Sequence, residues 1–105
     1  MKAMSLYLPH INYTVRVRDM KSLPKPHGSQ TTVHACIIYE GKHGSTVYLP
    51  TKPAPPMVAH ELTHVLFHIC RERHMDFLSE EEHMAYIMQY LMGQILGYKW
   101  DNRVT

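Results

Sequence analysis

The sequence predicts an α+β fold, in which a small antiparallel sheet of about three strands packs against two helices. The first half of the chain alternates apolar and polar residues as strands do, the second half repeats apolar residues at helical spacing, and a proline-rich stretch separates the halves. The chain has 105 residues, of which 45% are hydrophobic, which suffices for one modest core. We therefore expect a single domain over residues 1–105.

Three segments have the pattern of strands. Residues 10–18 put apolar side chains on one side and polar ones on the other, the period of a half-buried strand. Residues 31–39 are rich in β-branched and aromatic residues, and the glycines that follow predict a short hairpin turn into a third strand at 45–49. The residues before Pro9 are expected to be a short leader.

Two helices are expected after the proline-rich stretch. Prolines are tolerated in the first turn of a helix, so the first helix should begin at residue 55 or 56 and run to about 73. The second should span residues 79–96, with Ser79 as N-cap, Glu82 as its capping-box partner and Gly97 at its end.

The first predicted helix carries the sequence HELTH at residues 60–64, an HExxH motif. Residues four apart on a helix lie ~6 Å apart along its axis, so His60 and His64 could bind one Zn²⁺. Glu61 points aside from the metal and would hold a zinc-bound water, whose pKa zinc lowers to about 7, and accept its proton during attack on a carbonyl. The motif therefore predicts a zinc hydrolase with Glu61 as general base.

A tetrahedral zinc needs a third protein ligand besides a water molecule. Candidates are Glu80, Glu81 and Glu82 at the head of the second predicted helix. Glu82 is favoured because it shares a helical face with the small Ala85, which would let the two helices approach closely. Glu81 is the reserve choice, and Glu80 is expected in solvent. The alternative for all three is an acidic helix start that the helix dipole favours.

Other polar side chains near the motif have secondary roles in this interpretation. His68 lies ~12 Å from His60 along a straight helix, so one metal cannot reach both, and we expect His68 to be packed or to support the ligands. A proton donor or oxyanion stabiliser could come from His83, Tyr86 or Tyr90 on the second helix.

The run YLPTKPAPPMVAHELTHVLFH, followed by SEEEHMAYIMQYLMGQI, resembles the small zincin-type metallopeptidase-like proteins encoded by bacteriophages and prophages. In these proteins a strand ends at a proline-rich step into the HExxH helix, and a later helix opens with ExxAY, here residues 82–86. The resemblance covers about residues 45–97. It implies a minimal zincin-like core of gluzincin type, with zinc held by His60, His64 and Glu82, and with Glu61 as the base.

The composition limits which classes of partner and which cellular compartment we expect for this protein. The formal charge is +2 and the basic residues are scattered, which argues against a nucleic-acid partner. The sequence has no run of 18 apolar residues and no secretory signal pattern, and Cys36 and Cys70 are not spaced as a metal-binding pair. We therefore expect a reduced protein of the cytoplasm, that of the host cell if a phage encodes it, with no membrane partner.

The expected partner is a peptide or protein substrate. A peptide could add to an exposed sheet edge by main-chain hydrogen bonds, and the strand at 45–49 is the edge that we expect. The alternative function is a non-catalytic module that uses a zincin scaffold to bind a host or phage protein, because a short chain has little material for a second substrate-binding lobe.

Overall fold

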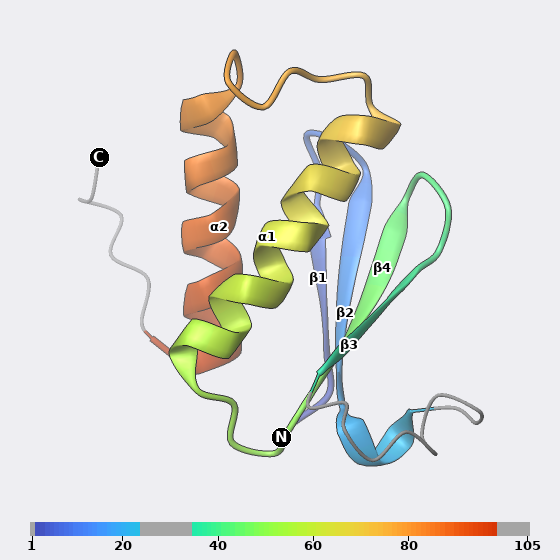
Figure 1. Cartoon of the computed structure of the whole chain (residues 1–105), viewed down its shortest axis with the longest axis vertical. Coiled ribbons are helices and arrows are strands. Elements are labelled where there is room, and N and C mark those ends of the chain that lie inside the picture. The colour runs from blue at the N-terminus through green and yellow to red at the C-terminus, as the bar shows by residue number, and fades with distance from the viewer. Residues whose placement is uncertain (1, 24–34, 99–105) are drawn as a thin grey trace.

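The computed structural model describes residues 2–23 and 35–98. In that part of the chain, strands come first and helices follow, which confirms the α+β class (Figure 1). The elements are β1 (Met4–Leu8), β2 (Tyr13–Asp19), the short 3-10 helix η1 (Met20–Ser22), β3 (Cys36–Tyr39), β4 (Gly44–Leu49), α1 (Pro55–Glu72) and α2 (Glu81–Leu96).

The sheet is mixed and has the strand order β1-β2-β4-β3, so the prediction of about three antiparallel strands was wrong in two respects. The expected leader forms β1, which pairs antiparallel with β2 and buries Leu6 and Leu8 next to exposed neighbours. The second error concerns β4, which inserts between β2 and β3. It is parallel to β2 and antiparallel to β3, since the chain crosses over before it forms the β3–β4 hairpin. Residues 31–34 of the predicted strand lie outside the described residues.

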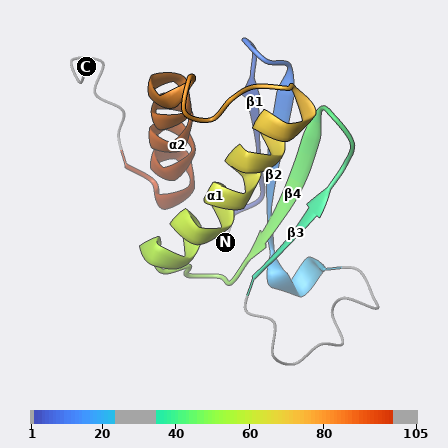
Figure 2. The same cartoon turned by 45° about the horizontal axis from the view of Figure 1, so that its top comes forward.

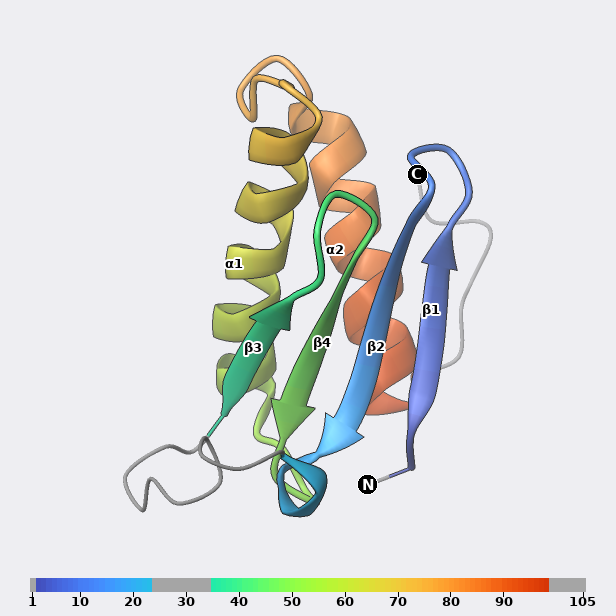
Figure 3. The same cartoon turned by 90° about the vertical axis from the view of Figure 1, so that its right-hand side faces the viewer.

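Both helices pack on one face of this sheet (Figure 3). The helix α1 lies alongside β4 and β3 (Figures 2 and 3), whereas α2 lies behind β2 and β1 in the view of Figure 3. The core between the layers includes the fully buried residues Tyr13, Val15, Val17, Val47, Leu49, Val58, Leu62, Val65, Ile69 and Leu91. Burying each large aliphatic side chain contributes roughly 1.5–3 kcal/mol, so this layer interface is the main source of stability.

The ends of the two helices agree only in part with the ends that the sequence predicts. Pro55 and Pro56 occupy the first turn of α1, as predicted, because their fixed φ suits a helix start. The capping box was wrong: α2 begins at Glu81, and the Ser79 hydroxyl donates to Asp76 Oδ2 instead of capping the helix. Gly97 ends α2 at φ 78°, in the left-handed region that glycine adopts without strain.

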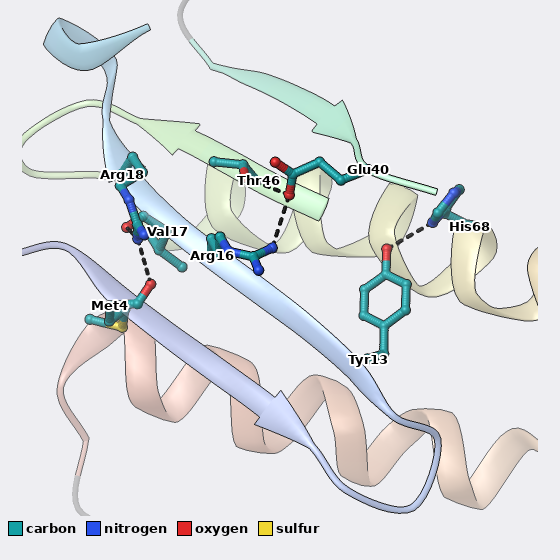
Figure 4. Close-up of polar contacts among 8 residues, drawn as sticks. All are labelled: Met4, Tyr13, Arg16, Val17, Arg18, Glu40, Thr46 and His68. Carbon is teal, nitrogen blue, oxygen red and sulfur yellow. Dashed lines mark hydrogen bonds and ion pairs between the residues drawn. The ribbon is translucent and has the colours of Figure 1, made fainter. Parts of the chain in front are cut away.

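The face of the sheet away from the helices carries charged side chains. Arg16 Nη1 donates to Glu40 Oε1 at 3.1 Å, and the Thr46 hydroxyl donates to the same oxygen at 2.9 Å (Figure 4). Arg18 Nη1 donates to the backbone oxygen of Met4 at 2.8 Å. Both arginines therefore make hydrogen bonds between elements of the fold.

Neither α1 nor α2, the two α-helices in the described part of the chain, has the length and the apolar composition of a membrane-spanning segment.

Candidate functional site

The two histidines of the motif lie together on α1. The imidazole centroids of His60 and His64 are 5.0 Å apart, with the rings inclined at 72°. The His60 side chain is 68% exposed, and His64 is exposed as well. One turn of regular helix produces this pairing, because residues at i and i+4 share a face. The pair therefore offers two nitrogen ligands to a metal arriving from solvent.

Glu61 lies on the sheltered side of the same helix. Its side chain is only 13% exposed, and its Oε2 lies 3.7 Å from His60 Nε2. This side faces the edge strand β3: burial raises the pKa of the Cys36 thiol, and the negative charge of Glu61 adds to the rise. Burial also raises the pKa of Tyr39 on β3; Arg71 opposes the rise, and Glu61 contributes to it. The negative charge of Glu61 therefore acts on side chains at both ends of β3.

The third predicted ligand does not join this pair. Within residues 2–23 and 35–98, no three His, Cys, Asp or Glu side chains gather as a set that could hold a metal. The helix α2 runs back antiparallel to α1, so its first turn lies beside the far end of α1 (Figure 1). A contact of 3.6 Å between Cys70 Sγ and Met84 Sδ fixes this alignment. Cys70 lies about 9 Å along the helix axis beyond His64, so the structure does not bring Glu82 to the histidines.

Glu81, the reserve choice, is the acidic residue that turns toward α1. A cavity of about 260 Å³ between the helices is lined by Leu66, Phe77 and Glu81, together with the apolar face of α2. Glu81 and Glu82 are both exposed, but only Glu81 lines this cavity, beside Ala85. Glu81 and Glu82 both share a helical face with Ala85, and the rotation of α2 points Glu81 rather than Glu82 into this cavity.

His68 is packed in the interior, as expected from its distance along the helix. It is 5% exposed, and its Nδ1 accepts a hydrogen bond of 2.7 Å from the Tyr13 hydroxyl (Figure 4). Its ring stacks on Tyr39 with centroids 4.3 Å apart, and its Nε2 lies 4.0 Å from Glu72 Oε1. Burial lowers the pKa of His68 more than Glu72 raises it. The neutral imidazole with its proton on Nε2 satisfies both neighbours.

This hydroxyl–imidazole–carboxylate order is also that of an activated nucleophile. Tyr13, however, is 0% exposed, and burial raises its pKa to about 12, the opposite of activation. The buried Ser45 Oγ lies near the phenol and offsets part of that rise, although it makes no well-formed hydrogen bond among the described residues. The cluster is therefore structural: it joins β2, β3 and α1 one turn beyond His64.

The expected proton donors on α2 are not near the histidine pair. His83, Tyr86 and Tyr90 line a separate cavity of about 310 Å³, against Tyr7 and the residues that follow it at the end of β1. Sequence reasoning did not single out Tyr39, which the structure places on the edge strand beside α1. The available signal was its position at the end of a predicted strand, which does not by itself indicate a neighbouring helix.

Comparisons of the chain with protein-family models, with curated proteins and with solved structures find no match. The fold and site together define an α+β protein whose HExxH helix lies on the side of the sheet where β3 is the edge strand.

Proposed function

We propose that this protein is a zinc-dependent metallopeptidase, in which His60 and His64 bind the metal and Glu61 is the general base. The observation that supports this most directly is the combination of an exposed imidazole pair, centroids 5.0 Å apart, with an adjacent carboxylate that is 13% exposed. The resemblance to phage-encoded zincin-type proteins points the same way.

The sheet offers a place for the substrate, but not at the strand first expected. β4 lies between β2 and β3 and all six of its residues are buried, so the prediction of peptide addition at residues 45–49 was wrong. β3 is the edge strand on the α1 side of the sheet. An extended peptide that paired with β3 would pass alongside Glu61, because Cys36 and Tyr39 both feel the charge of that carboxylate.

The chemistry of this chain's own residues centres on Glu61. When bound, zinc would supply Lewis acidity toward the scissile carbonyl and lower the pKa of water. Glu61 would accept the proton of the attacking water and deliver it to the leaving amine. Partial burial suits that role, since charge interactions are stronger where water is excluded.

A catalytic zinc is held by three protein ligands, and this structure provides two of them. His60 and His64 are in place, while the third position has no donor among the described side chains. Glu82 is the ligand that the resemblance implies, and Glu81 is the carboxylate that faces α1. We assign the pair and the base here, and the choice between the two glutamates is left to a direct comparison of their variants.

A matched pair of variants tests the function. Glu61→Gln should keep bound zinc, measured by metal analysis of the purified protein, and should lose hydrolysis of a pool of unfolded peptides followed by mass spectrometry. His60→Ala should lose both. Hydrolysis that continues unchanged in Glu61→Gln would end the assignment of the base, and a wild-type protein that binds no zinc would end the metallopeptidase proposal.

The missing third ligand favours a second candidate, a non-catalytic module that uses this scaffold to bind a host or phage protein. That candidate requires wild-type protein without peptide turnover. It also requires a protein partner that binds the wild type and Glu61→Gln equally well, because Glu61 performs no chemistry in a non-catalytic module.

A further inference from the structure

The cavity between β1 and α2 is walled by aromatic rings. The ring-bearing residues that line it are Tyr7, His10, His83, Tyr86 and Tyr90. Its floor is apolar, because Leu8 is 7% exposed and Ile87 is 6% exposed. Tyr7 and Tyr86 remain 51% and 40% exposed, so much of their surface is free for a ligand. At about 310 Å³ the cavity is at the lower end of small-molecule sites.

This cavity is distinct from the histidine pair. No α1 residue is among the described side chains that line it, and its lining residues come from the end of β1, the turn after it and α2. The Tyr7 hydroxyl donates to Asn12 Oδ1 at 3.0 Å, a bond that holds this ring against the β1–β2 turn. The strand-side wall is therefore fixed before any ligand arrives.

Acidic side chains stand next to the cavity. Neither Lys nor Arg is among the described residues that line it. Glu80 Oε2 lies 3.9 Å from His83 Nδ1, and Glu82 shares a helical face with Tyr86, whereas Glu81 lines the cavity between the helices. The amino end of a helix carries about half a positive charge, which the two carboxylates of Glu80 and Glu82 outweigh. A cation is therefore favoured at this mouth over an anion.

We propose that this cavity binds an alkylammonium group, with the tyrosine rings contacting the cation and with Glu80 and Glu82 at the start of α2 attracting it. Faces of electron-rich rings attract organic cations, and sets of such rings recognise quaternary ammonium groups. The apolar floor of Leu8 and Ile87 suits the alkyl part, which a hydrated inorganic cation lacks. The group could belong to a free amine or to a lysine side chain, and both have the same chemistry.

Two matched pairs of probes test the proposal on the full chain. Tetramethylammonium is compared with its neutral isostere tert-butyl alcohol, and N-acetyl-lysine methylamide is compared with the norleucine analogue. Binding is followed by the amide chemical shifts of Leu8 and Ile87. The proposal predicts that at least one cation binds several-fold more tightly than its neutral match. Preference for the first indicates a fully alkylated ammonium, and preference for the second indicates a lysine side chain.

Variants separate the ring from the hydroxyl. Tyr86→Phe should keep the affinity within about twofold, because the ring face remains, whereas Tyr86→Leu should weaken binding on the order of 3- to 10-fold. Phe67→Leu, a change at an aromatic residue on α1 that is 51% exposed, is the control and should change nothing. Tyr7→Leu gives an independent test from the strand side if Tyr86→Leu disturbs α2. Equal binding of cation and isostere, or no binding of either cation, overturns the proposal.

Discussion

The hydroxyl of Tyr13 on β2 donates a hydrogen bond of 2.7 Å to Nδ1 of His68 on α1, across the interface between sheet and helix. Both side chains are buried, and they are 55 residues apart in the sequence. The bond therefore fixes how α1 is rotated against the sheet, one turn from the histidine pair.

Removing the hydroxyl should destabilise the fold. In Tyr13→Phe, Nδ1 of His68 is left buried without its donor, and an unsatisfied buried polar group costs roughly 1–3 kcal/mol. The midpoint of urea unfolding should fall accordingly. Tyr98→Phe, at a tyrosine that is 70% exposed, is the control and should leave the midpoint unchanged. Equal midpoints for Tyr13→Phe and the wild type would mean that the bond contributes nothing.

Tyr13 should also make the stability of the fold decrease with rising pH in the alkaline range. Burial raises the pKa of Tyr13 to about 12 in the folded protein, while an unfolded tyrosine titrates near 10. The unfolded chain therefore loses this proton first, and stability that is complete below pH 10 declines as pH rises toward 12. The free energy of unfolding should fall more steeply in this window for the wild type than for Tyr13→Phe. Parallel pH profiles would contradict this, since all other tyrosines are shared.

Acid should destabilise the fold through His68. Its folded pKa is lowered, chiefly by burial, so the unfolded chain takes up this proton first as the pH falls. Stability is complete above the unfolded value near 6.5 and is lost as the pH falls through the lower folded value. His68→Leu should have a flatter profile of unfolding free energy between about pH 7 and pH 5. A wild type that is no more acid-sensitive than this variant would contradict the prediction.

Zinc should raise the melting temperature through the histidine pair. A ligand that binds only the folded state adds RT ln(1 + [L]/Kd), about 2.7 kcal/mol at a hundredfold excess over Kd. His64→Ala should abolish the zinc-dependent shift. Glu81→Gln and Glu82→Gln then form a matched pair: the one that loses most of the shift identifies the third ligand. A full shift in His64→Ala would show that zinc binds elsewhere.

The two helices could be predicted because local rules determine them. The prolines at the start of α1, its regular apolar repeat and Gly97 after α2 are all readable within one turn of helix. The strand β1 escaped prediction because only Leu6 and Leu8 are buried in its five residues, too few to show an alternation. The parallel pairing of β2 with β4 depends on contacts that no local pattern records.

In the candidate site, too, local features could be predicted from the sequence and features that depend on distant contacts could not. HExxH spacing places His60 and His64 together because one helical turn does so in any context. Which of Glu81 and Glu82 points into the cavity between the helices depends on the rotation of α2, and this rotation is set by packing around Met84 rather than by a local pattern. The stacking of Tyr39 on His68 joins the end of a strand to a helix residue 29 positions later. No local sequence pattern in either segment predicts this contact.

The parallel pairing of β2 with β4 also has a kinetic consequence. It begins at Thr14 and Gly44, so the centre of the sheet closes a loop of about thirty residues before it gains any ladder bonds. The β1–β2 and β3–β4 hairpins close far shorter loops and can form first. The speed of folding should therefore depend on how much chain joins β2 to β3, so that lengthening this connection slows folding more than it alters the final balance between folded and unfolded molecules.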